Sequence, residues 1–184
     1  MTPALTLEPL SRAHLPEMAA LWADPAVIRW TNIAAPCTAA EAAERLDRLL
    51  ACQRGLPAPA VFAVRERETF RGLAGCPPAD ASAGTYGLFY QLLPACWGRG
   101  LGLAAAREAL RRLEKLTPSL VLADTVAENT ASVRILERLG FVRTAVRSGA
   151  FRREGRALDI WDYALRRGGS DGSALRDGPH ITEK

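Results

Sequence analysis

The sequence has no run of about 18 or more apolar residues, so no segment is long enough to cross a membrane as a helix. The N-terminal residues lack a basic stretch followed by a long apolar core, which argues against a secretory signal. Histidine occurs only twice and the cysteines are far apart, so no spacing typical of a zinc site is present. We therefore expect a cytoplasmic protein without a metal site, whose cysteines are reduced and mostly buried: Cys37, Cys52, Cys76 and Cys96.

A strong excess of charge of one sign is also missing. Basic residues outnumber acidic residues 24 to 20 without a block of like charges, so binding to nucleic acid is not expected. Almost all the basic residues are arginine, which favours bidentate contacts with phosphate or carboxylate groups. A chain of 184 residues, 48% of them apolar, suits one domain with a substantial core. We assign this domain to residues 1–167 and predict that residues 168–184, with few apolar side chains, form a disordered tail.

Hydrophobic periodicity predicts an alternation of helices and strands. Thr38 and Glu41 have the spacing of a capping box, and Gly140 is expected to end the last helix. Residues 77–84 are typical of turns throughout. The predicted helices lie at 13–23, 39–52, from 100 to about 116, and at 129–139, and the predicted strands at 5–10, 60–64, 70–76, 85–93, 119–126, 141–147 and 157–165. This order indicates a single α/β or α+β domain with a mixed sheet.

The most informative segment is W-G-R-G-L-G-L-A at 97–104, between a predicted strand and a predicted helix. Alternating glycines let a ligand approach the backbone, and a helix N-terminus attracts phosphate. A turn that only needs glycine at positive φ is the simpler alternative. The segment also matches the dinucleotide-binding pattern G-x-G-x-x-A, with Asp124 at the end of the next strand. That fold needs several more strand–helix units than the remaining residues provide, so we set this interpretation aside.

The same segment resembles the acyl-CoA loop Q/R-x-x-G-x-G/A of the GNAT acetyltransferases, with Trp97 at the first position. A second similar motif is N-x-x-S-x-x-x-x-E-x-x-G-F at 129–141, and a weaker third is G-x-x-x-D-x-x-x-Y at 155–163. The resemblance extends over residues 5 to about 167, and it is greatest to the ribosomal-protein N-terminal acetyltransferases of the RimJ/RimL type.

The resemblance implies a GNAT fold of the α/β (α+β) class. We expect a mixed central β-sheet of about six or seven strands, flanked by about four helices, with a splayed pair of strands that forms the acyl-CoA cleft. The implied co-substrate is acetyl-CoA, and the implied partner is a primary amine, either a protein N-terminus or a small molecule. The acetyl group would pass by direct attack in a ternary complex, without a metal, nucleic acid or membrane. A homodimer is compatible with the resemblance.

The resemblance also implies roles for individual residues. Ser132 would protonate the leaving thiolate, Asn129 would contact the pantetheine amides, and the backbone N–H of Leu93, or of Leu92, would face the thioester oxygen. Helix capping by Asn129 and packing by Ser132 are the structural alternatives. The expected cofactor-binding residues are Leu92, Leu93, Trp97, Gly98, Arg99, Gly100, Leu101, Gly102, Leu103, Ala104, Asn129, Ser132 and Arg134, and the expected acceptor-binding residues are Trp30, Tyr90 and Trp161.

Two departures from the family pattern are visible. Leu136 stands where many relatives have a tyrosine, and residues 85–93 contain no acidic residue that could act as a general base. Deprotonation of the amine by water, Glu8, Tyr86 or Tyr90 therefore stays open. The departures make a GNAT-fold protein that binds acyl-CoA without transferring it the alternative hypothesis.

Overall fold

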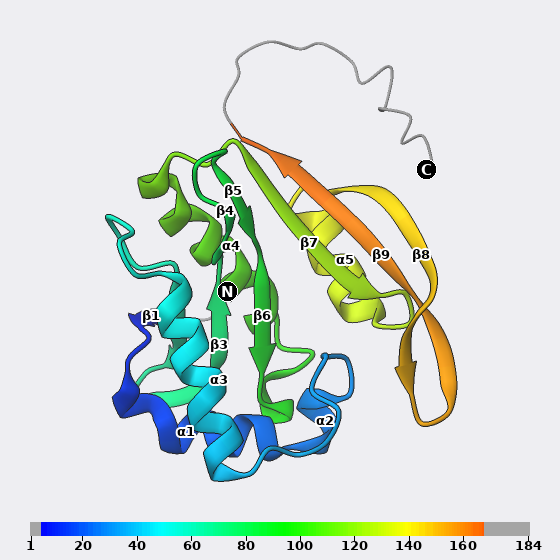
Figure 1. Ribbon diagram of the computed structural model, residues 1–184, viewed down its shortest axis with the longest axis horizontal. Helices are drawn as coiled ribbons and strands as arrows, with labels where there is room; N and C mark the ends of the chain where they lie inside the picture. The colour runs from blue at the N-terminus through cyan, green and yellow to red at the C-terminus, as the bar shows by residue number, and fades with distance from the viewer. Residues whose placement is uncertain (1–4, 168–184) are drawn as a thin grey trace.

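The computed structural model describes residues 5–167, which form two β-sheets with helices on both faces of the first (Figure 1). The first sheet is antiparallel, with its strands in the order β1 (Leu5–Pro9), β2 (Val61–Glu66), β3 (Thr69–Gly75) and β6 (Phe89–Leu92). The second has the order β4 (Pro78–Asp80), β5 (Thr85–Gly87), β7 (Leu120–Val126), β9 (Arg156–Arg166) and β8 (Val142–Arg153). The tail expected at 168–184 lies outside the described residues.

Two cores lie on opposite faces of the first sheet. Val61 and Ala63 of β2 pack in one core with α1 (Leu15–Ala23), α2 (Pro25–Ile28) and α3 (Ala39–Cys52). Phe62 and Val64 pack in the other with α4 (Leu101–Leu113) and with part of α5 (Thr130–Arg138). Because both faces of this strand are covered, β2 begins as a continuous apolar run rather than an alternating one. Short 3₁₀ turns occur at Arg12–His14, Pro94–Cys96 and Glu114–Leu116.

Local signals in the sequence placed several boundaries correctly. The Thr38 N–H donates to Glu41 Oε2 at 2.8 Å, and the Glu41 N–H donates to Thr38 Oγ1 at 3.3 Å, which confirms the capping box of α3. Gly140 follows α5 with a φ of +86°. The first helix begins later than expected, at Leu15, because residues 12–14 form a 3₁₀ turn.

The strand expected at 85–93 divides at Leu88, so the expectation of one strand is wrong. Residues before Leu88 pair in parallel with β7, whereas residues after it pair with β3. The Leu88 N–H donates to the Leu122 carbonyl at 2.8 Å, and beyond this bond β6 and β7 diverge into different sheets (Figure 1). The expected splayed pair is therefore confirmed, although the single central sheet is replaced by two sheets of four and five strands.

Two smaller expectations also need correction. Residues 77–84 are not turns throughout, since Pro78–Asp80 forms the short strand β4 against β5. All four cysteines are free, but only Cys76 and Cys96 are buried, while Cys52 is exposed. Within residues 5–167, no helix is both long and apolar enough for a membrane crossing.

Candidate active site

The glycine-rich segment leads from β6 into α4, and its glycines have different structural roles. Gly98 and Gly100 have φ angles of +71° and +80°, and a Cβ added to either would meet nothing within 4 Å. These two positions require glycine for their backbone conformation. Gly102 is helical, and a Cβ there would lie 3.0 Å from Cδ1 of Ile135. The third glycine therefore allows the close approach of α5 to α4.

Within residues 5–167, six consecutive backbone N–H groups at this point have no hydrogen-bond acceptor. The Trp97 N–H donates to the Pro94 carbonyl at 3.0 Å, and the Ala104 N–H donates to the Gly100 carbonyl at 3.1 Å. Between them, the amides of residues 98–103 have no acceptor among the residues that the structure describes. They lie at the positive end of the 13-residue helix α4, which is a favourable place for an anion. Ala104 was expected to contribute its amide, and the structure contradicts this because that amide belongs to the helix.

The side chains of this loop contribute less than its backbone. Leu101 is fully buried, so only its amide is available to a ligand. Arg99 forms an ion pair with Glu66, with Nη2 and Oε1 2.7 Å apart, and Glu66 also pairs with Arg71. Desolvation opposes ionisation of Glu66, but hydrogen bonds and the charges of the two arginines outweigh it and lower the pKa of Glu66. The Arg99 guanidinium is thus held beside the loop.

The edge of β6 that faces the split carries free backbone groups. Leu93 donates its N–H to the Arg71 carbonyl at 2.9 Å, so the expectation that Leu93 supplies the oxyanion donor is wrong. Because Leu92 pairs with Gly72, alternation along the strand turns the N–H groups of Tyr90 and Leu92 away from β3. The Leu92 carbonyl on this edge accepts a hydrogen bond from the indole N–H of Trp97 at 2.8 Å. Of the two residues considered, Leu92 is the one whose N–H points away from β3.

The first turn of α5 places two predicted residues at the split. Asn129 caps the helix, with Oδ1 accepting the Ser132 N–H at 3.3 Å. The Ser132 hydroxyl lies 2.8 Å from the Tyr90 hydroxyl, which comes from the facing strand β6. Burial raises the pKa of Tyr90 to about 12. Leu136, one turn further along α5, is buried in the core.

The comparison with known proteins decides the family. Residues 4–142 match the model of the acetyltransferase (GNAT) domain family. The chain belongs to the GNAT family. The uncharacterized N-acetyltransferase p20 of Bacillus licheniformis is 24% identical over 170 residues, which cover 89% of this chain and 93% of that protein.

Solved structures show the same GNAT fold at low sequence identity. Spermidine N-acetyltransferase from Vibrio cholerae, in complex with CoA and spermine, has a TM-score of 0.74 and 20% identity, covering 88% of this chain and 95% of that one. RimL, a ribosomal L7/L12 alpha-N-protein acetyltransferase in complex with CoA, has a TM-score of 0.77 and 15% identity, covering 88% and 93%. The predicted family and fold are confirmed, while the RimJ/RimL subgroup has only this distant support.

A cavity of about 370 Å³ opens where the GNAT strands part. Asp124 and Asp162 line it from directly paired positions on β7 and β9, and Arg147 binds both carboxylates at 2.7 Å. Their place at the cavity was not expected, because the strand register that joins them is not encoded locally. The lining comprises Pro77, Gly87, Leu88, Phe89, Leu122, Ala123, Asp124, Thr144, Asp162 and Tyr163.

Each of the three expected acceptor residues contacts a different group. Tyr90 contacts Ser132, whereas the Trp161 ring lies 4.4 Å from the Arg143 guanidinium and the Trp30 ring lies 4.8 Å from that of Arg29. The hairpin of β8 and β9 is hydrogen-bonded to the loop that contains Trp30. Arg153 of this hairpin donates to the carbonyls of Ile28, Thr31, Ile33 and Ala34 at 2.8–3.4 Å.

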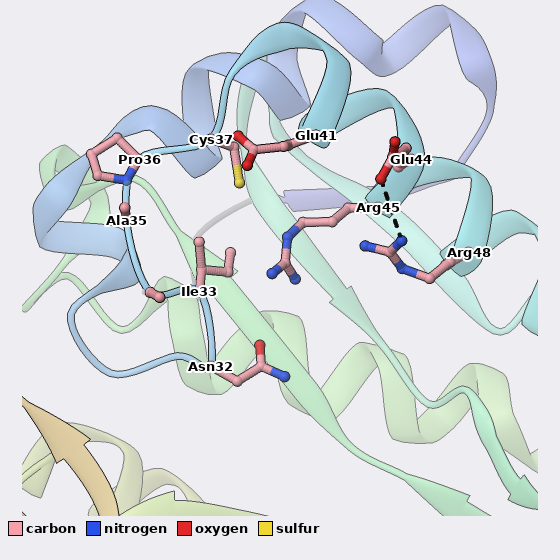
Figure 2. Close-up of a pocket in the computed structure, with 10 residues that line it drawn as sticks. Asn32, Ile33, Ala35, Pro36, Cys37, Glu41, Glu44, Arg45 and Arg48 are labelled. Carbon is pink, nitrogen blue, oxygen red and sulfur yellow. Dashed lines mark ion pairs between the residues drawn. The ribbon is translucent and has the colours of Figure 1, made fainter.

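Two other base candidates and a second pocket lie elsewhere in this GNAT domain. Glu8, on the edge strand β1 of the first sheet, pairs with Arg65 of β2, and the buried Tyr86 donates to the Leu116 carbonyl at 3.4 Å. A pocket of about 360 Å³ lies between residues 32–37 and α3, and Figure 2 shows the Arg45 side chain extending from α3 toward Ile33. None of the expected site residues lines this second pocket.

Proposed function

We propose that this chain is an acetyl-CoA-dependent N-acetyltransferase that acts on a primary amine by direct attack in a ternary complex. The observation that carries the proposal is the run of free amides at residues 98–103, in front of α4 and beside the split between β6 and β7. Such a run suits the pyrophosphate of CoA, because several N–H donors and the helix dipole act on the same anion. CoA-bound neighbours of the same fold support this choice of ligand.

The pantetheine arm would lie along the free edge of β6 as an additional strand. The amides of Tyr90 and Leu92 face this edge and need acceptors, and a pantetheine carbonyl would accept the hydrogen bond of the Tyr90 N–H. The Leu92 N–H would then point at the thioester oxygen and stabilise the oxyanion. Loss of one such donor typically raises the barrier by about 3 kcal/mol.

The chemistry balances with a single net proton transfer. The amine nitrogen attacks the thioester carbon, and the C–S bond then breaks with its electron pair on sulfur. Ser132 donates the hydroxyl proton to sulfur and recovers a proton from water, while the amine nitrogen releases its surplus proton through water or to Asp124 or Asp162 at the cavity. An α-amine, with a pKa near 8, reaches the reactive neutral form more readily than an alkylamine with a pKa near 10.

A covalent acetyl-cysteine does not fit the site. Cys96 is the cysteine nearest in sequence to the loop, but its side chain is buried and desolvation raises its pKa. A thiol in this state is a poor nucleophile. We therefore expect Cys96→Ala to retain acetyl transfer, measured as CoASH release, whereas loss of transfer with an intact fold would favour a covalent route.

The first test is a thermal-shift titration with acetyl-CoA, CoA and NADH in parallel. A ligand at about 100 times its dissociation constant stabilises the fold by about 2.7 kcal/mol, which raises the melting temperature by a few degrees. We expect a rise with both CoA species and none with NADH. A rise in melting temperature with NADH alone, or no rise with any of the three ligands, would contradict the assignment of the loop.

The alternative is a GNAT-fold protein that binds acyl-CoA without transferring it. The buried, apolar Leu136 favours this alternative, since it stands where many relatives have a tyrosine. Binding of acetyl-CoA does not by itself distinguish the enzyme from the inactive protein. Release of CoASH in the presence of an amine would favour the enzyme, and binding without release would favour the inactive protein.

A further inference from the structure

We infer that Tyr90 is a positioning residue for acetyl transfer, because its hydroxyl orients the Ser132 hydroxyl toward the sulfur of bound CoA. The inference rests on the proposed function and assigns a source for the orientation of Ser132 that the helix itself does not provide. Tyr90 acts through Ser132 and is not required to touch the reacting atoms.

The contact joins the two walls of the split. Tyr90 lies on β6, the edge strand of the first sheet, and Ser132 lies on α5, which follows β7 of the second sheet. Their hydroxyl oxygens are 2.8 Å apart, although the residues are 42 positions apart in the sequence. Asn129 fixes the Ser132 N–H from the other side at 3.3 Å. Ser132 is therefore held at its backbone by the helix cap and at its hydroxyl by the facing strand.

In the inferred arrangement, Tyr90 donates the proton of the hydrogen bond to Ser132 Oγ. A phenol has a single proton to donate, and the Tyr90 oxygen is 2.8 Å from Ser132 Oγ but 3.4 Å from the Ser132 carbonyl oxygen. Donation to Oγ is the stronger bond. Ser132 Oγ then accepts from Tyr90 and keeps its own proton for a third group. Since burial raises the pKa of Tyr90 to about 12, the phenol keeps its proton at neutral pH.

Without the phenol, the Ser132 hydroxyl is free to rotate to another acceptor. Serine in a helix commonly donates its hydroxyl to the carbonyl three or four residues earlier, which for Ser132 is that of Asn129 or Glu128 at the start of α5. A hydroxyl bonded there no longer faces the split. Removal of Tyr90 should therefore weaken the hydrogen bond to sulfur while leaving the backbone contacts of CoA intact.

The test measures the pKa of the thiol of bound CoA, which needs no knowledge of the acceptor amine. The fraction of thiolate is followed by ultraviolet absorbance during a pH titration of CoA bound to the wild type and to Tyr90→Phe, Ser132→Ala and the double variant. A hydroxyl that donates to sulfur favours the thiolate and lowers this pKa. We expect each single variant to reduce the thiolate fraction roughly threefold to tenfold at a pH below the thiol pKa, and the double variant to add nothing.

Tyr86→Phe is the matched control. Tyr86 lies on β5, is buried, and donates its hydroxyl to the Leu116 carbonyl rather than to α5. It should leave the thiol pKa of bound CoA unchanged. Thermal melts of all the variants separate a loss of fold from a change at the site, and with an amine that is turned over, Tyr90→Phe should lower kcat while KM for acetyl-CoA stays constant.

Two outcomes would overturn the inference without affecting the proposed function. The first is a thiol pKa of bound CoA in Tyr90→Phe that equals that in wild type. The second is tighter binding of CoA by Tyr90→Phe, which would show that CoA has to break the contact between Tyr90 and Ser132 in order to bind. If wild type does not bind CoA at all, the proposed function fails together with the inference.

Discussion

Leu103→Glu should weaken acetyl-CoA binding without making the fold less stable than that of the matched variant Leu103→Gln. Leu103 is the third residue of α4, is partly exposed, and has one of the free amides. A carboxylate in the first turn of a helix interacts favourably with the helix dipole, by about 0.3–1 kcal/mol. The Glu variant should therefore melt no lower than Leu103→Gln, which has nearly the same shape without the charge.

The expected loss of affinity follows from the charges. Two unit charges about 4 Å apart in water interact by about 1 kcal/mol, and the pyrophosphate carries more than one charge near the new carboxylate. The sum is on the order of 1–2 kcal/mol, so we expect the Glu variant to bind acetyl-CoA roughly 5–30 times more weakly than the Gln variant. Because the repulsion is screened by salt, the difference should shrink at high ionic strength.

Calorimetric titration of both variants at two salt concentrations measures this difference directly. Equal affinities for acetyl-CoA at low salt would refute the reasoning, because a pyrophosphate bound at residues 98–103 is repelled by a carboxylate within the same turn. A lower melting temperature in the Glu variant alone would instead show that the site is not anion-attracting.

Three further predictions concern the scaffold and its pH dependence. Gly72→Ala should lower the free energy of unfolding in urea by about 3 kcal/mol or more, because the added Cβ would lie 2.1 Å from the Gln91 carbonyl oxygen, a backbone atom that cannot move aside. A decrease below about 1 kcal/mol would contradict this. Arg153→Ala should speed amide hydrogen exchange across residues 29–37 relative to wild type, because it removes the hydrogen bonds that Arg153 donates to this loop. Unchanged exchange there would show that the loop is stable without Arg153. Hydrogen bonds from Arg111 and Arg112 lower the pKa of Glu108 to about 2, so the stabilisation from this ion pair is present above pH 4.5 and is lost as the pH falls toward 2. The melting temperature of Glu108→Gln should therefore fall less than that of wild type across this range. Melting temperatures that fall equally in both proteins would contradict a stabilising ion pair.

The parts of the fold that depend on neighbours in sequence were predictable, and the parts that depend on register were not. The capping box at Thr38 and the glycine after α5 use contacts within one turn. By contrast, residues 85–93 contain no charged residue and no break in the pattern, and nothing local says that their pairing changes sheet at Leu88. A shift of one residue reverses the direction of every amide, so the sequence could not choose Leu92 over Leu93.

The same reason explains what the sequence missed at the candidate site. The glycine loop and the first turn of α5 were found because each is a continuous motif. The contact of Tyr90 with Ser132 and the pairing of Asp124 with Asp162 join residues from separate elements. The roles of Arg134, the homodimer and the cytoplasmic location stay predictions.

Acetyl transfer itself provides the most direct test of the proposed function. The protein is incubated with acetyl-CoA and, in separate reactions, a polyamine, an amino sugar and a short peptide with a free N-terminus, and CoASH and the acetylated amine are both quantified. We predict CoASH release that depends on the amine and equals the amount of acetylated product. Saturating binding of acetyl-CoA with no release for any amine would contradict the proposed enzyme and favour a protein that only binds acyl-CoA.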